Sequence, residues 1–265
     1  MGTSASSRGP GSGVPLVPDW VPAAPGQQTP PPADGGNPSP VAPTARFRPA
    51  RTSLGQYGRD GGARDLRRGI GHYSRKGLGG AASAAQRMAG TAQTAGGLYG
   101  VLDALRTGTP LPPSFSINTG TLAGRSQSEI ADIITNALRP VDGTQDTEAA
   151  RDAVSRALSE VLALDPNADL AALTTDQINL VIESYIACDL AHRIELDVGK
   201  AILDKAPNYA QGVDRLEEMK AYIRQEVARA FRARAHVGQT MNRQVAASLA
   251  NDIIRDTFEI FESYL

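Results

Sequence analysis

Few residues in this 265-residue sequence could do chemistry, and they do not form a recognisable set. Asp189 and His192 are three residues apart and Glu195 follows one turn later, so a helix would place them on one face. A metal site would need a further ligand from another element, so a solvated polar stripe is the favoured interpretation. The single cysteine, Cys188, lies in an apolar helical pattern and is expected to be a small buried core residue.

The sequence also lacks the short signatures of common enzyme classes. No phosphate-binding loop, dinucleotide-binding glycine pattern, nucleophile elbow or His-Glu-x-x-His motif occurs. We therefore expect a protein that is not an enzyme and that holds no metal and no cofactor.

The N-terminal end offers one reactive group. A small residue after Met1 favours removal of the methionine, which would leave Gly2 with a free α-amine. An α-amine loses its proton at lower pH than a lysine side chain does, so part of it is neutral and nucleophilic at cytoplasmic pH. Gly2 cannot obstruct a narrow active site, and the hydroxyls of Thr3, Ser4 and Ser6 could hydrogen-bond its wall. The same opening fits the loose pattern for N-myristoylation.

An apolar island, residues 15–22, interrupts the polar N-terminal segment and contains the only tryptophan of the chain. Its prolines disfavour helix and favour an extended polyproline geometry. An exposed tryptophan beside leucine and valine suits a linear docking motif, so we expect the island to bind another protein. Packing onto the chain's own body is the alternative. The residues expected to contact a partner are Thr3, Ser4, Ser6, Pro15, Leu16, Val17, Pro18 and Trp20.

The net charge of −1 hides an uneven distribution. Residues 46–76 carry nine basic side chains against two acidic ones, whereas residues 77–265 have a net charge of −7. The basic segment could follow a phosphate backbone with its aromatic rings available for stacking, or it could pair with an acidic protein surface. A solvated helix or loop face is the simplest alternative. The basic residues of interest are Arg46, Arg48, Arg51, Arg67, Arg68, Arg75 and Lys76.

Composition divides the chain into an N-terminal tail and a helical remainder. Twelve of the 18 prolines fall in the first 50 residues, which have too little apolar surface to offset their ordering entropy. The sequence shows no secretory signal and no run of 18 apolar residues, so we expect a cytoplasmic protein without a membrane span. One cysteine excludes a disulfide framework.

Helical periodicity becomes regular from residue 126 onward. Capping boxes at Ser126 and Thr174 open two helical segments, of which the second is apolar on almost every side and is expected in the middle of a bundle. Three further segments lie at about 146–164, 212–235 and 239–264. The predicted fold is mostly α: a C-terminal bundle of about five helices behind a long disordered, Pro/Gly-rich tail. The predicted segments are a tail over 1–45, a basic segment over 46–80, a small-residue helix with a Pro-rich linker over 81–125, and a helical domain over 126–265.

Several stretches of the sequence resemble the QatB family of the Qat anti-phage defence systems. The resemblance is carried by the opening Met-Gly-Thr-Ser-Ala-Ser, by the apolar island, and by the run from Arg46 through Leu54-Gly55 to His72-Tyr73-Ser74. The order of parts, from tail to basic segment to helical C-terminal half, is similar as well. The distinctive motifs lie in the first 80 residues.

The resemblance implies a non-enzymatic component that works with an ATPase, a QueC-like enzyme and a TatD-like nuclease. In such systems the QueC-like enzyme is understood to couple an activated deazaguanine to the N-terminal glycine of a partner protein. Carried onto this sequence, Gly2 becomes the acceptor after Met1 is lost. Two alternatives stay open: a nucleic-acid-binding adaptor that uses residues 46–76 to present DNA to a nuclease, and a scaffold anchored to a membrane through a lipid on Gly2.

Overall fold

The computed structural model describes residues 14–18, 21–25, 41–111, 115, 117, 122, 124–234 and 241–265, with the side chains of residues 145 and 146 left aside. Every regular element in these ranges is a helix. The one pairing of extended segments described there is an isolated antiparallel bridge between Pro15 and Val41. The prediction of a mostly α fold is confirmed, while much of the expected N-terminal tail lies outside the described residues.

Helices begin earlier in the chain than the periodicity indicated. Pro49 lies in the first turn of the first helix, where its missing N–H costs nothing, and Gly61 ends that helix in a left-handed conformation. The glycines that lower helix propensity in this region lie where helices touch, and Gly69 for example packs directly against Leu54. The N-terminal helices are α1 (Arg48–Asp60), α2 (Ala63–His72), the π-helical η1 (Tyr73–Leu78), α3 (Ala81–Arg87) and α4 (Ala89–Thr107).

The helices expected from residue 126 onward are present. Ser126 with Glu129 and Thr174 with Gln177 form the two predicted capping boxes. The long third segment continues as a helix through a π-helical turn and ends before Pro207. The C-terminal helices are α5 (Gln127–Leu138), α6 (Gln145–Leu164), α7 (Thr175–Ile194), η3 (Glu195–Gly199), α8 (Lys200–Leu203), α9 (Tyr209–Arg234) and α10 (Arg243–Glu262).

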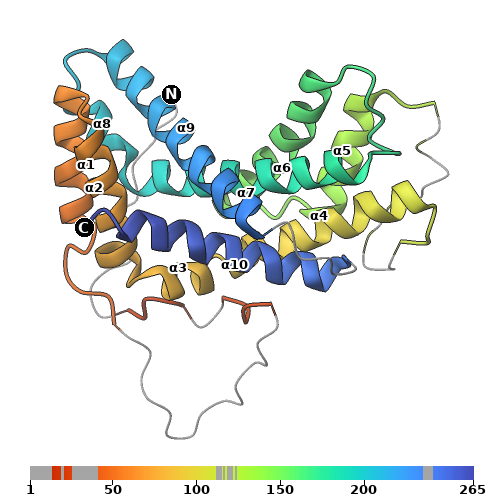
Figure 1. Ribbon diagram of the computed structural model, residues 1–265, viewed down its shortest axis with the longest axis horizontal. Coiled ribbons are helices and arrows are strands. Elements are labelled where there is room, and N and C mark those ends of the chain that lie inside the picture. Colours follow the sequence, from red (N-terminus) through yellow and green to blue (C-terminus); the bar gives the residue numbers. More distant parts are fainter. Residues whose placement is uncertain are drawn as a thin grey trace, which may run out of the picture.

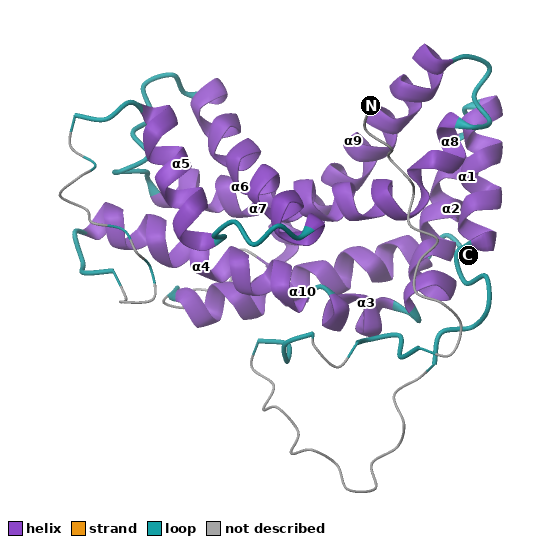
Figure 2. Cartoon of the chain, turned by 180° about the vertical axis from the view of Figure 1, so that it is seen from behind, coloured by secondary structure: helices purple, strands orange, loops and turns teal. Residues whose placement is uncertain are grey.

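The helices share one hydrophobic core. Helix α7 packs against α4, α6 and α9, and α10 lies along α3 and α4. Helices α1, α2 and α8 gather at one end of the molecule and α5 and α6 at the other, with α10 and α4 running between them (Figures 1 and 2). The core extends from Phe47 to Phe261, so residues on both sides of position 126 contribute to it.

A close approach between α4 and α10 depends on Gly96. A Cβ at this position would lie 2.5 Å from the carbonyl oxygen of Arg243 and 2.7 Å from Cβ of Ala247. We expect Gly96→Ala to lower the free energy of unfolding by about 1–3 kcal/mol, because the two helices must move apart. Gly90→Ala in the same helix is the control, since its nearest neighbour would be an arginine nitrogen at 3.6 Å.

Chemical denaturation of both variants checks this prediction. Gly90→Ala should leave stability unchanged or raise it by up to about 1 kcal/mol through helix propensity. Equal stability of the two variants would contradict the close approach of α4 and α10.

Candidate functional site

The described part of the N-terminal segment lies against the helical body. We call residues 14–25 the strap; residues 19 and 20 within it lie outside the described residues. The carbonyl of Val14 accepts a hydrogen bond from the amide of Ala42 at 2.9 Å, next to the Pro15–Val41 bridge. The side chain of Leu16 is 7% exposed, and its Cδ1 occupies the space where a Cβ of Gly79 would be. Gly79 has φ +85°, so both its backbone and the leucine favour glycine here.

Two side chains from the body hold the strap through its backbone. Arg87 Nη1 donates to the carbonyl of Leu16 at 3.1 Å, and Gln93 Nε2 donates to the carbonyl of Ala23 at 3.4 Å. Ala24 is buried as well. Arg87 of α3 and Gln93 of α4 thus hold the strap near its two ends. Both acceptors are backbone carbonyls, so these hydrogen bonds do not require particular side chains in the strap.

Part of the strap borders a cleft of about 540 Å³. Val21 and Pro22 line this cleft from the strap side. Its other polar walls come from several helices, and the charged residues among them are Arg87, Arg139, Arg193 and Asp197. Val21 and Pro22 therefore lie beside charged side chains of the body, whereas Leu16 and Ala24 are buried.

Placement of the predicted docking island is mixed. Leu16 packs on the chain's own body, which is the alternative that the sequence left open, and Pro15, Val17 and Pro18 are half-buried beside it. Trp20 lies outside the described residues, as do the predicted acceptor Gly2 and the neighbouring hydroxyls of Thr3, Ser4 and Ser6.

Residues 46–78 form a packed pair of helices, which we call the basic hairpin: α1 and α2 joined at Gly61-Gly62 and extended by η1. The aromatic rings of this segment are buried: Phe47 is 3% exposed, and Tyr57 and Tyr73 are each 1% exposed. The expectation that these rings are available for stacking on bases is therefore wrong, because the rings fill the core between helices. The predicted basic residues that are exposed are Arg48, Arg67, Arg68, Arg75 and Lys76.

Two arginines of the predicted set serve the hairpin's own packing. Arg51 Nη2 donates to the carbonyl of Asp197 at 2.8 Å and thereby ties α1 to η3. Arg46 is 5% exposed, and its guanidinium lies 4.7 Å from the centre of the Phe47 ring. Burial and the nearby charge of Arg87 lower the pKa of Arg46. Neither side chain belongs to the exposed basic surface.

Asp197 joins these groups into a polar contact inside the fold. Its Oδ2 accepts a hydrogen bond from the hydroxyl of Tyr73 at 2.9 Å. Burial raises the pKa of Asp197, against the opposing effect of the Tyr73 hydrogen bond and of nearby arginines. Burial likewise raises the pKa of Tyr73, with Asp197 adding to the shift. This contact fixes η1 against η3 and so positions the basic hairpin.

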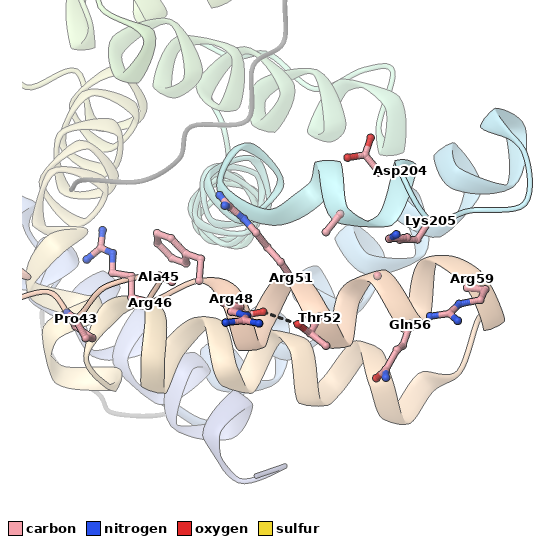
Figure 3. A pocket seen from close by; sticks show the side chains of 13 residues that line it. Pro43, Ala45, Arg46, Arg48, Arg51, Thr52, Gln56, Arg59, Asp204 and Lys205 are labelled. Carbon is pink, nitrogen blue, oxygen red and sulfur yellow. Dashed lines mark hydrogen bonds between the residues drawn. The ribbon is translucent and has the colours of Figure 1, made fainter. Parts of the chain in front are cut away.

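A groove runs between α1 and α8, with a volume of about 550 Å³ (Figure 3). Gly55 and Ala201 line it where the two helices approach each other. Arg48, Arg59 and Lys205 line it as exposed cations. The one acidic side chain among its lining residues, Asp204, is paired with Lys200 at 3.3 Å. The groove is therefore a cationic surface with little acidic neutralisation.

The polar residues considered as ligands in the sequence, Asp189 and His192 on α7 and Glu195 at the start of η3, do not form a shared metal site in the described structure. Asp189 is fully buried and accepts hydrogen bonds from Thr91 Oγ1 at 2.5 Å and from Arg193 Nε at 2.9 Å. No group of three His, Cys, Asp or Glu side chains suited to a metal ion is found within the described ranges. Burial raises the pKa of the Cys188 thiol, with Arg224 Nη2 3.8 Å from its sulfur, so this cysteine is a weak nucleophile.

The clamp residues Arg87 and Gln93 were missed by sequence reasoning. Arg87 could have been noticed in the sequence, because it and Asp103 are the only charged residues in the Ala/Gly-rich stretch 79–105. A lone arginine in a tightly packed small-residue helix pair needs a backbone or acidic partner, and the strap supplies it.

These observations define a class of all-helical protein with an N-terminal strap clamped onto its body and no convergent catalytic group in the described part of the chain. The family model for the Qat anti-phage system associated protein QatB matches residues 79–261. The chain belongs to the QatB family and is thus a component of the Qat anti-phage system. No curated protein and no solved structure matches the chain.

The matched range begins after the basic hairpin and includes both strap clamps, Arg87 and Gln93. None of the helices described combines the length and apolar character that crossing a bilayer requires.

Proposed function

We propose that this chain is the non-enzymatic adaptor of its Qat system and that its N-terminal amine, on Gly2, is the acceptor for a deazaguanine group supplied by a QueC-like partner enzyme. Membership of the QatB family supports a role beside other Qat proteins. The observation that carries the proposal is the clamped strap, because it connects the N-terminal end to one defined place on the body.

The proposed chemistry is an acyl transfer. The partner enzyme uses ATP to convert the carboxylate of a deazaguanine precursor into an acyl adenylate, and pyrophosphate leaves. The neutral α-amine nitrogen attacks the acyl carbon, the bond to AMP breaks, and the amine loses a proton to solvent. The product is an amide on Gly2. The chain contributes only a nucleophile without a side chain, so no catalytic group is required on its body.

The clamp limits where the amine can go. Gly2 is twelve residues before Val14, so the connecting chain spans at most about 40 Å. An enzyme docked on the body within that radius meets the amine at the high effective concentration of a short tether. An enzyme that recognised only the terminal residues would gain nothing from the clamp.

Co-expression with the other Qat proteins followed by intact-mass measurement tests the proposal. Gly2→Glu removes the small second residue that favours loss of Met1, so the variant should carry no deazaguanine. Ala5→Glu places the same charge on the same tail and should be modified like the wild type. An unmodified Gly2 in the presence of the active partner enzyme would sink the proposal, and a fatty acyl mass on Gly2 would favour the lipid-anchored alternative.

A further inference from the structure

The basic hairpin concentrates exposed cations that have no carboxylate partner. On the other helices, several exposed arginines pair with a carboxylate of their own helix, as Arg156 does with Asp152 at 2.6 Å and Arg106 with Asp103 at 2.6 Å. Exposed arginines without an ion pair among the described residues occur there as well, at Arg224, Arg232 and Arg243, but they are not gathered in one segment. Among the described residues, the exposed cations of the hairpin form no ion pair. They are Arg48, Arg59, Arg64, Arg67, Arg68, Arg75 and Lys76.

The unpaired cations of α2 and η1 lie close together. Arg64 and Arg68 are four residues apart and so lie on one face of α2, and Arg75 follows in η1, which continues that helix. After burial, the charges of Arg68 and Lys76 are what lower the pKa of His72, which lies on the same helix. On the neighbouring flank, the Arg67 guanidinium lies 5.3 Å from the ring centre of Tyr264. The result is a surface with a large excess of positive charge, in which these cations form no ion pair with a described carboxylate.

Helix α1 adds a second set of cations at the groove described above. Arg48 and Arg59 are eleven residues apart, which corresponds to about 16 Å along the helix. Lys205 approaches from α8 (Figure 3). Such separated cations suit a nucleic-acid strand, because its phosphates repeat along the backbone and each cation can contact a different phosphate.

We propose that the basic hairpin binds the phosphate backbone of duplex DNA without reading its sequence. Arginines that no internal carboxylate neutralises leave their charge available to an external polyanion. The contact adds a nucleic-acid surface to the chain that is independent of any chemistry at Gly2.

The same surface is a poor fit for an acidic protein. Protein interfaces draw much of their stability from buried aromatic or apolar anchors at their centre. No large hydrophobic side chain of residues 46–78 is exposed, because the aromatic and aliphatic side chains of both helices point into the core. The buried rings also leave nothing in this segment on which unpaired bases could stack, so backbone contact with a duplex is favoured over single-strand binding.

Fluorescence anisotropy with the full chain and a labelled duplex of about 20 base pairs tests the proposal. With five to six phosphate contacts, the logarithm of the binding constant should fall with the logarithm of salt concentration with a slope near −5. Affinity should therefore drop by roughly 1,000-fold between 50 and 200 mM salt.

Charge-matched variants locate the surface. The triple variant Arg64→Gln, Arg68→Gln, Arg75→Gln should bind at least tenfold more weakly at low salt, with a slope smaller by about 2.7. The control triple Arg106→Gln, Arg125→Gln, Arg156→Gln removes the same charge from exposed arginines that are paired with carboxylates. Circular dichroism of both variants should match that of the wild type, because all six side chains are exposed.

Three results would overturn the proposal: no duplex binding by the wild type, an equal loss of affinity in the control triple, or displacement of the duplex by polyglutamate at an equal concentration of charge. Each result leaves the Gly2 proposal standing, since the mass measurement depends on the tail alone.

Discussion

Replacing Arg193 by methionine is expected to lower the free energy of unfolding by about 3–5 kcal/mol. The reason is the full burial of Asp189, whose Oδ2 lies 2.9 Å from Arg193 Nε. Thr91 supplies one hydrogen bond to the same oxygen, and the other carboxylate oxygen has no hydrogen-bond partner in the described structure. Removing the arginine leaves a buried charge without its cation, and such a loss is among the costliest single changes in a protein core.

Arg156→Met is the matched control for this prediction. Arg156 and Asp152 are also four residues apart on one helix, with nitrogen and oxygen 2.6 Å apart, but both side chains are more than half exposed. Its loss should cost no more than about 0.5 kcal/mol. Urea denaturation measures the free energy of unfolding of both variants. A similar loss of stability in the two would contradict the importance of Arg193 for the buried Asp189.

Leu16→Asp is expected to release the strap while leaving the helical core folded. Burial of a leucine side chain contributes about 1.5–3 kcal/mol, so the population with an undocked strap should rise roughly 10- to 100-fold. The amide of Ala42 reports this directly, because it donates to the carbonyl of Val14. Its hydrogen-exchange rate should increase by the same factor.

Val41→Asp tests whether this effect comes from the buried side chain. Val41 pairs with Pro15 in the same bridge, but its side chain is 55% exposed. Exchange at Ala42 should change by less than about threefold in this variant. Slow exchange in Leu16→Asp would mean that the clamps at Arg87 and Gln93 hold the strap without the leucine.

Much of the C-terminal half could be predicted from the sequence, because its helices carry strong local signals. The capping boxes at Ser126 and Thr174 and the apolar spacing between them determine where helices begin and which faces are buried. The basic hairpin had no such signal. Its glycines lower helix propensity, and their benefit appears only when Gly58 meets the backbone of Ile202 and Gly69 meets Leu54 in the folded chain.

The candidate site was predicted in part. The charge of residues 46–76 indicated a basic surface, but not that Arg46 would be buried or that the rings would fill the core. Tertiary packing decides both, since an aromatic residue between arginines can face either solvent or core. The motifs that suggested the family lie in the first 80 residues, whereas the family match covers residues 79–261. The helical half is therefore more distinctive than its regular periodicity indicated.

The strap lies between the helical body and the N-terminal Gly2 in the sequence. Its clamps lie in the matched range, and its other end leads toward Gly2. A body that holds the chain at the strap, twelve residues after Gly2, is suited to deliver the proposed acceptor amine to an enzyme docked nearby. The basic hairpin on the same body would bring such an assembly to DNA.

The fragment-ion spectrum of the N-terminal peptide, from protein purified together with its Qat partners, tests the central claim most directly. We predict a deazaguanine acyl group on the amine of Gly2 in the wild type and in the Ala5→Glu variant. We predict that the Gly2→Glu variant lacks this group. An unmodified Gly2 amine beside an active QueC-like enzyme, or the same group attached to a lysine instead, would contradict it.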